Sequence, residues 1–148
     1  MPLPTLAESA IIIGARADDW RAAVRLAGRA LCDSGATNAG YSDEMIRMID
    51  EHGPYVVIAP GLALAHARPG PDVLADGLAV VTLATPVLFG HPHNDPVSVV
   101  VGLAIKSAET HLETVAELAN IFNDSSAISR LATASSVAEI QEIMGNAS

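Results

Sequence analysis

The sequence predicts an α/β fold, a three-layer α/β/α sandwich in which helices cover both faces of a β-sheet. Two observations carry this prediction. Short, β-branched segments bounded by turns are concentrated in the middle of the chain, and segments with helical periodicity lie before and after them. The middle segments are also apolar along almost their whole length, which is typical of strands buried on both faces. With 148 residues, the chain is expected to form a single domain over residues 1–148.

Two helices are predicted before the strands. The first covers residues 18–33, with Asp18 or Asp19 as the N-cap and Gly35 just beyond its end. Its apolar face comprises Trp20, Val24, Ala27 and Leu31. The second covers residues 42–51 and ends before the Gly53-Pro54 pair. Its buried residues are expected to be Met45, Ile46 and Ile49.

Four strands are predicted in the middle of the chain, at residues 55–58, 62–65, 77–83 and 97–103. Residues 10–13 are a candidate for another short strand. These segments are rich in valine, isoleucine and leucine and are separated by glycine, proline and polar residues.

Three helices are predicted in the last third. Thr110 and Glu113 have capping-box spacing before the first, which would bury one face made of Leu112, Val115, Ala119 and Phe122. Asp124 would start a short helix that ends near residue 131. Ser136 and Glu139 repeat the capping-box spacing before a final helix, whose buried residues would be Val137, Ile140 and Met144.

Composition excludes several classes of protein. Half of the residues are hydrophobic and 17% are charged, which excludes intrinsic disorder. A net charge of −9 argues against a nucleic-acid or anionic-membrane partner, since both require a positive face. The lone Cys32 excludes an internal disulfide and is expected to pack at the core or its boundary. No cationic residue precedes Arg16, and no apolar run reaches about 18 residues, so we expect a cytoplasmic, soluble protein without a secretory signal or membrane insertion.

His66 and Arg68 are the first candidate functional residues. They follow an apolar strand and precede the loop Pro69-Gly70-Pro71. Side chains two residues apart on a strand share a face, so an imidazole and a guanidinium can meet there. Together they could hold a phosphate or carboxylate group, because arginine donates two parallel hydrogen bonds. The alternative is a partly buried histidine at a strand end beside a surface arginine.

His111 is the second candidate, because it would lie in the first turn of the helix that Thr110 starts. The free N–H groups and the dipole of a helix start favour an anion there, and an imidazole can donate to a phosphoryl oxygen. The alternative is an exposed histidine without a function.

A third candidate is the segment His91-Pro-His93-Asn-Asp95, in which two histidines and a carboxylate have the spacing of zinc or iron ligands. No further ligand completes a recognisable set nearby, and a turn built by Pro92 and Asn94, or a loop that supports the site, is the alternative. The chain has no glycine-rich phosphate loop before a helix and no nucleophile elbow. We expect neither a cofactor nor a metal.

The segment from Gly53 to Arg68, with Ile58-Ala-Pro-Gly61 and His66-Ala-Arg68, resembles the active-site segment of the enzyme IIA components of the bacterial phosphoenolpyruvate-dependent sugar phosphotransferase system. Within the mannitol/fructose IIA family it is most similar to the ascorbate-type branch. The resemblance extends from about Leu6 to Ile143. It is supported downstream by Phe89-Gly-His91, Asn94-Asp-Pro-Val97, Val101-Gly-Leu-Ala104 and His111-Leu-Glu113.

The resemblance implies a mixed β-sheet flanked by helices and a phosphoryl relay. His66 matches the phosphorylated histidine of the family, and His111 matches its second active-site histidine. The expected donor is the histidine phosphocarrier protein, and the expected acceptor is a cysteine of a IIB component. A membrane IIC component would take part indirectly by importing the sugar, expected to be ascorbate or a related one.

The chain departs from the family at two places. Ala65 stands where the family usually has proline, and residues 49–51 read Ile-Asp-Glu where the mannitol branch carries an active-site arginine. Arg68 is therefore our candidate for the cation that holds the phosphoryl group. Two alternatives remain: a regulatory IIA-like protein that signals through phosphorylation of His66, and a metal-dependent hydrolase that uses His91, His93 and Asp95.

Overall fold

The computed structural model describes residue 4 and residues 6–145, and Met1 to Leu3, on which the expectation of no secretory signal partly rests, lie outside the described residues. A single 3-10 turn at Glu8–Ala10 precedes the first strand. The strands are β1 (Ile11–Ala15), β2 (Val57–Ala59), β3 (Leu62–His66), β4 (Gly77–Val87) and β5 (Val97–Ala104). The helices are α1 (Trp20–Asp33), α2 (Tyr41–His52), α3 (Ala108–Phe122), α4 (Ser125–Thr133) and α5 (Val137–Ile143).

The strands form one mixed sheet in the order β1-β4-β5-β3-β2. The pairs β1–β4 and β3–β5 are parallel, whereas β4–β5 and β2–β3 are antiparallel. The predicted α/β fold with a mixed sheet is confirmed. β4 continues four residues beyond its predicted end, because an irregularity after Thr82 lets Val87 pair with Val97. β2, which pairs with β3, covers Val57–Ala59 instead of the predicted residues 55–58.

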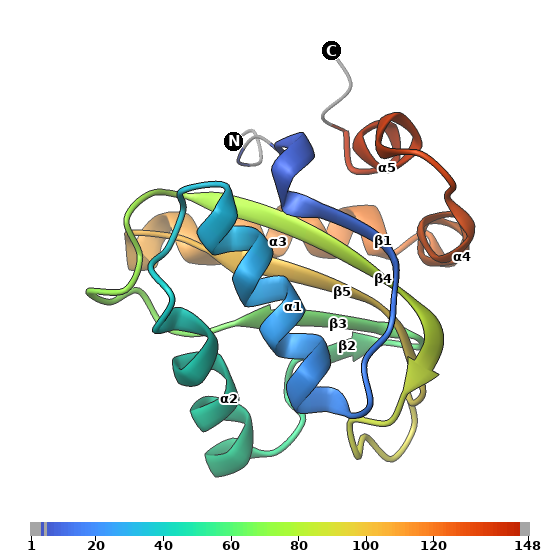
Figure 1. Ribbon diagram of the computed structural model, residues 1–148, viewed down its shortest axis with the longest axis horizontal. Coiled ribbons are helices and arrows are strands. Elements are labelled where there is room, and N and C mark those ends of the chain that lie inside the picture. The colour runs from blue at the N-terminus through green and yellow to red at the C-terminus, as the bar shows by residue number, and fades with distance from the viewer. Residues whose placement is uncertain (1–3, 5, 146–148) are drawn as a thin grey trace.

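Helices cover both faces of the sheet (Figure 1). α1 and α2 lie on the near face, and α3 and α4 lie on the far face. α1 starts where Asp19, one of the two predicted caps, accepts a hydrogen bond from the backbone N–H of Ala22 at 2.8 Å. α2 packs closely on α1 at Gly28, where an added Cβ would lie 1.9 Å from the hydroxyl oxygen of Ser42.

The start of α3 corrects one prediction. Ser107, not Thr110, is the N-cap, and its hydroxyl accepts from the Thr110 N–H at 3.2 Å. The Ser107 hydroxyl also donates a hydrogen bond to the Thr110 hydroxyl at 2.9 Å. Thr110 thus lies inside the helix and holds the capping side chain in place. The predicted capping box with Glu113 is therefore wrong, and the helix begins one turn earlier.

The buried face of α3 also differs from the predicted one. The structure buries Thr114, Leu118 and Phe122, whereas Leu112 is 72% exposed and Ala119 is exposed. Thr114 is tolerated in the core because its hydroxyl donates to the carbonyl of Thr110 at 2.8 Å. Only Phe122 of the four predicted residues is fully buried.

The two C-terminal helices start at the predicted caps. Asp124 accepts from the Ser126 N–H at 3.0 Å, and Ser136 accepts from the Glu139 N–H at 3.2 Å. The second capping box is only half formed, because the Glu139 carboxylate binds the hydroxyl of Ser135. No helix within the described part of the chain is long and apolar enough to span a membrane.

The side chain of Tyr41, at the start of α2, joins three parts of the fold. It is buried, and its hydroxyl donates to the carbonyl of Leu103 in β5 at 2.8 Å and accepts from the N–H of Ala67 at 3.0 Å. Burial raises the pKa of Tyr41 to about 12, which keeps the hydroxyl protonated and able to donate. The chain just beyond β3 is thereby tied to both α2 and β5.

Replacing Tyr41 with phenylalanine is expected to lower the free energy of unfolding by about 1–3 kcal/mol, because it leaves a buried carbonyl and a buried N–H without their partner. Urea denaturation of both proteins measures the difference. The control is Tyr55→Phe, which removes a hydroxyl from a side chain that is 37% exposed and should cost less. Equal losses in the two variants would contradict a special role for the Tyr41 hydroxyl.

Candidate active site

His66 is the last residue of β3, where the strand leaves the sheet. Its Nδ1 lies 2.7 Å from the backbone carbonyl of Leu64. A carbonyl can only accept, so Nδ1 must carry the ring proton. In the neutral ring, Nε2 then has a free lone pair. This nitrogen has no hydrogen-bond partner in the part of the chain that the structure describes, and it is not buried.

Tyr55 holds His66 from the side of β2. Its hydroxyl donates to the backbone carbonyl of His66 at 3.0 Å. The two rings meet edge to face, with centroids 5.4 Å apart and planes at 82°. Both the backbone and the ring of His66 are thus in contact with one residue that sequence reasoning missed.

His111 lies beside His66, with the two ring centroids 5.3 Å apart. The predicted proximity of the two histidines is therefore found, although His111 begins the second turn of α3. Its own N–H donates to the carbonyl of Ser107 at 3.0 Å and is not free to bind an anion. The ring Nδ1 is buried without a partner. An unpaired buried N–H is costly, so the ring proton belongs on Nε2, at the accessible end.

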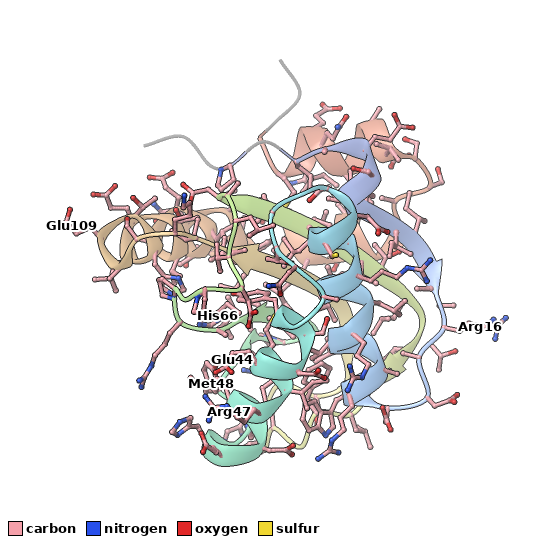
Figure 2. All side chains as sticks on the ribbon, turned by 60° about the vertical axis from the view of Figure 1, so that its left-hand side comes forward. Arg16, Glu44, Arg47, Met48, His66 and Glu109 are labelled. Carbon is pink, nitrogen blue, oxygen red and sulfur yellow. The ribbon has the colours of Figure 1, made fainter. Side chains whose placement is uncertain are left out.

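Both histidines line a pocket of about 600 Å³, together with Met48, Tyr55, Arg68 and Leu112. Figure 2 shows His66 beside α2, with Glu44, Arg47 and Met48 projecting from that helix. Arg68 is exposed and has no ion-pair partner among the described residues, so its guanidinium is free for a ligand. Arg47, by contrast, is held by the carboxylates of Glu44 and Glu51.

The pocket keeps its two histidines neutral near pH 7. Burial lowers the pKa of His66, the hydrogen bond to Leu64 opposes this effect, and the neighbouring His111 lowers the pKa further. Burial alone lowers the pKa of His111. A neutral imidazole with a fixed Nδ1–H and a free Nε2 is a nucleophile. A second imidazole that carries its proton on Nε2 can donate a hydrogen bond to an anionic group bound beside the first.

The segment from His91 to Asp95 is a hydrogen-bonded turn away from this pocket. The Nδ1 of His91 accepts from the N–H groups of His93 and Asn94 at 3.1 and 3.0 Å. One carboxylate oxygen of Asp95 accepts from the N–H groups of residues 89, 90 and 91 at 3.0, 2.7 and 3.1 Å. These bonds occupy Nδ1 of His91 and one carboxylate oxygen of Asp95, and they hold the segment as a turn. Within residues 4 and 6–145, no group of three or more histidine, cysteine or acidic side chains is arranged to hold a metal.

Neither Cys32 nor Ala65 lines the pocket. Cys32 is half-buried near the end of α1, as expected for a packing residue at the core boundary. Ala65 is buried in β3 and pairs with Gly102 of β5, so the strand reaches His66 without the proline that the family usually has.

Known proteins that are similar to this chain identify its family. Residues 5–147 match the model of the family described as "Phosphoenolpyruvate-dependent sugar phosphotransferase system, EIIA 2". The chain is 34% identical over 142 residues to an ascorbate-specific PTS system EIIA component of Shigella boydii, covering 95% of this chain and 92% of that protein.

Two solved structures are also similar. One is the complex of mannitol enzyme IIA with phosphorylated mannitol enzyme IIB from Escherichia coli, with a TM-score of 0.86, 27% identity and coverage of 97% of this chain and 99% of that one. The other is the mannitol IIA of Escherichia coli, with a TM-score of 0.83, 27% identity and coverage of 95% and 99%. Residues 5–147, which the family model matches, include the whole pocket and all five strands. The chain belongs to the EIIA type 2 family of the phosphoenolpyruvate-dependent sugar phosphotransferase system.

Proposed function

We propose that this protein carries a phosphoryl group on Nε2 of His66 during uptake of ascorbate or a related sugar. The observation that carries the proposal is the hydrogen bond from Nδ1 of His66 to the carbonyl of Leu64, which leaves Nε2 as the free nitrogen of a neutral ring. The 34% identity to an ascorbate-specific EIIA component supports the choice of sugar.

In the proposed reaction, the Nε2 lone pair of His66 attacks the phosphorus of a phosphohistidine on the donor protein. The new P–N bond forms as the donor's P–N bond breaks, and the donor histidine leaves as a neutral imidazole. The His66 ring becomes cationic, and its Nδ1–H bond to Leu64 becomes charge-assisted and stronger. This bond therefore stabilises the transition state more than the ground state. In the next step, a thiolate attacks phosphorus and His66 leaves as a neutral ring.

His111 and Arg68 are assigned to the phosphoryl oxygens. Phosphoryl transfer has a loose transition state with negative charge on three equatorial oxygens, so donors placed around them lower its energy. The Nε2–H of His111 supplies one donor beside His66. The unpaired guanidinium of Arg68 lines the same pocket and supplies a flexible, permanent cation.

The proposed partners are the histidine phosphocarrier protein as donor and the cysteine of a IIB component as acceptor. The related mannitol IIA forms a complex with phosphorylated IIB, which supports the acceptor. The IIB component would then phosphorylate the sugar while a membrane IIC component imports it, so IIC would take part only indirectly. A regulatory role would use the same phosphohistidine, and onward transfer to a IIB cysteine distinguishes transport from regulation.

Incubation with phosphorylated histidine phosphocarrier protein is expected to add one acid-labile phosphoryl group, because His66 presents a free Nε2. The variant His66→Ala should gain none. Intact-mass measurement detects the group, and peptide mapping locates it. His93→Ala, which changes an exposed histidine outside the pocket, is the control and should be labelled like the wild type. Equal labelling of His66→Ala would refute the proposed carrier residue.

The titration of the two histidines should follow their burial. Both are expected to titrate with midpoints below the ordinary value of 6.5. The unfolded chain therefore binds more protons than the folded one in this range, so stability is complete above about pH 6.5 and falls as the pH drops through the folded pKa values. Long-range ¹H–¹⁵N NMR measures the midpoints and also shows whether Nδ1 of His66 carries the proton. Midpoints at or above those of the urea-unfolded protein would contradict the burial argument.

Replacing His111 with alanine is expected to slow transfer to and from His66 by roughly 10- to 100-fold, since it removes one charge-assisted hydrogen bond of about 1.5–3 kcal/mol. The variant should still accept one phosphoryl group on His66. Quench-flow transfer in both directions measures the rates, with His93→Ala as the matched control. Unchanged rates, or a phosphoryl group on residue 111 of the wild type, would exclude this role.

A further inference from the structure

Tyr55 lies just outside the sheet, in the turn between α2 and β2. Its N–H donates to the carbonyl of Gly53 at 2.8 Å, and the N–H of Val57 closes the turn by donating to the carbonyl of Pro54 at 3.1 Å. These backbone hydrogen bonds fix the point from which the Tyr55 side chain starts. The side chain is 37% exposed and lines the pocket of His66.

Hydrogen bonds link this turn to the end of β3. The carbonyl of Val56 accepts from the N–H of Leu64 at 2.7 Å. The carbonyl of Leu64 accepts from Nδ1 of His66 at 2.7 Å, and the carbonyl of His66 accepts from the Tyr55 hydroxyl at 3.0 Å. Because Val56 and Tyr55 are neighbours in the sequence, the turn holds residues 64–66 at both ends.

The Tyr55 hydroxyl replaces a strand partner for His66. β2 pairs with β3 at Leu62 and Ala63, and His66 lies three residues beyond that pairing. The hydroxyl therefore supplies the donor that a neighbouring strand supplies in the middle of a sheet. Burial raises the pKa of Tyr55, an effect that the nearby cation Arg68 opposes, so the hydroxyl stays protonated at neutral pH and remains a donor.

The Tyr55 ring contacts the imidazole of His66 directly. The two rings meet edge to face, with centroids 5.4 Å apart and planes at 82°. This is a favourable arrangement for an aromatic pair, and it changes the balance between competing orientations by roughly 2- to 10-fold. The hydrogen bond from Nδ1 to Leu64 contributes a factor of similar size. Turning the imidazole about its Cβ–Cγ bond breaks both contacts, so the orientation of His66 rests on the two together.

The orientation of the imidazole decides which nitrogen reacts. Away from the Leu64 carbonyl, Nδ1 no longer has to carry the proton, and the neutral ring can place it on Nε2. Nε2 then has no lone pair for attack on phosphorus, and Nδ1 becomes the nucleophilic nitrogen. An imidazole with two orientations would therefore give two products.

We propose that Tyr55 is a positioning residue for phosphoryl transfer at His66: its ring keeps the imidazole on the Leu64 carbonyl, and its hydroxyl fixes the end of β3 from which the imidazole projects. This inference rests on the proposed function and adds a residue that acts through His66. The ring determines which nitrogen is phosphorylated, and the hydroxyl affects the rate alone.

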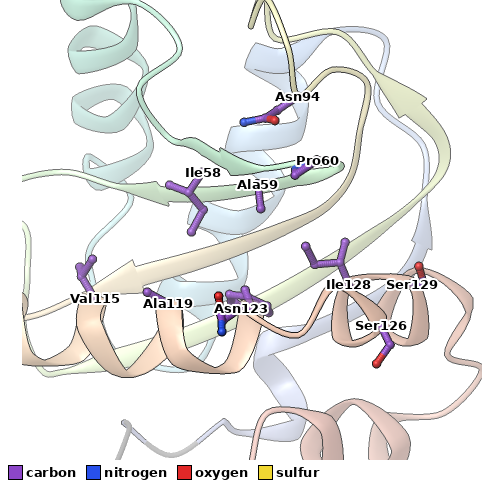
Figure 3. Close-up of a pocket in the computed structure, with 11 residues that line it drawn as sticks. Ile58, Ala59, Pro60, Asn94, Val115, Ala119, Asn123, Ser126, Ile128 and Ser129 are labelled. Carbon is purple, nitrogen blue, oxygen red and sulfur yellow. The ribbon is translucent and has the colours of Figure 1, made fainter.

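Two variants separate the ring of Tyr55 from its hydroxyl. Tyr55→Phe removes only the hydroxyl, whereas Tyr55→Ala also removes the ring. The matched control is Ile58→Ala, which shortens an apolar side chain of similar exposure, 41%, at the same edge of the sheet. Figure 3 shows Ile58 of β2 opposite Val115 of α3, where it lines a second pocket of about 740 Å³ and not the pocket of His66.

Labelling by the small donor phosphoramidate reports on His66 without a protein partner. The bond from phosphorus to the His66 nitrogen forms as the P–N bond of phosphoramidate breaks, and the donor nitrogen leaves as ammonia. Intact-mass kinetics gives the rate constant. Long-range ¹H–¹⁵N NMR at about pH 8, where both histidines are neutral, shows which nitrogen carries the proton before the reaction and which carries phosphorus after it. Labelling by the phosphorylated histidine phosphocarrier protein is measured in parallel.

We expect the wild type, Tyr55→Phe and Ile58→Ala to carry the proton on Nδ1 and phosphorus on Nε2. Tyr55→Phe should react about two- to threefold more slowly than the wild type, and Ile58→Ala at the wild-type rate. Tyr55→Ala should react about three- to tenfold more slowly. In Tyr55→Ala alone, the Nε2–H tautomer should appear, and roughly a tenth or more of the product should carry phosphorus on Nδ1. Circular dichroism checks that each variant is folded, and Tyr55→Leu repeats the test if Tyr55→Ala is not.

The outcomes separate the positioning role from the proposed function. Phosphorus on Nε2 alone in Tyr55→Ala, at any rate, would overturn the positioning role and leave the carrier function in place. The same Nδ1 product in Ile58→Ala would also overturn it, because a loosened sheet edge would then explain the change. The same product in Tyr55→Phe would overturn the separate role of the ring. Failure of both donors to label His66 of the wild type would overturn the proposed function itself.

Discussion

The buried hydroxyl of Tyr41 is the interaction on which the site depends. It binds the N–H of Ala67 and the carbonyl of Leu103, and so joins the first turn of α2 to the residue after His66 and to the end of β5. Without it, the three segments, which meet at the C-terminal ends of β3 and β5, would have no common polar contact among these residues. Because α2 is also pressed onto α1 at Gly28, the position of His66 is set by the packing of the near layer as a whole.

Burial and reactivity are compatible at His66 because the two ring nitrogens lie in different surroundings. Nδ1 faces a backbone carbonyl, and Nε2 faces an open pocket. Burial favours the neutral ring, which is the nucleophilic form, and in the proposed transfer the carbonyl would stabilise the positive charge of the phosphorylated ring. The two ring nitrogens of His111 also lie in different surroundings, since Nδ1 is buried and Nε2 is accessible. The same packing thus provides both a nucleophile and a donor.

Periodicity and capping residues were enough to predict the α/β class, the strands and most helices, because Asp19, Asp124 and Ser136 act locally on their own helices. α3 was harder because Ser107 and Thr110 are both possible caps. Its apolar stripe was also assigned to the core, although the fold buries the Thr114 side instead. His66, His111 and Arg68 were predicted and do share a pocket. Tyr41 and Tyr55 were missed because their partners are backbone atoms of residues 11 to 62 positions away.

The acceptor for Nδ1 of His66 has a consequence for how this family can vary. It is a main-chain carbonyl, which every amino acid at position 64 possesses, including proline. No point substitution of the Leu64 side chain can delete it, and replacement at position 65 leaves it in place as long as the strand persists. The course of the backbone therefore determines that Nε2 is the nitrogen left free, and substitutions of the side chains at positions 64 and 65 do not change this. In this chain the residue before the histidine is Ala65, and the proposed carrier atom, Nε2, is still left free.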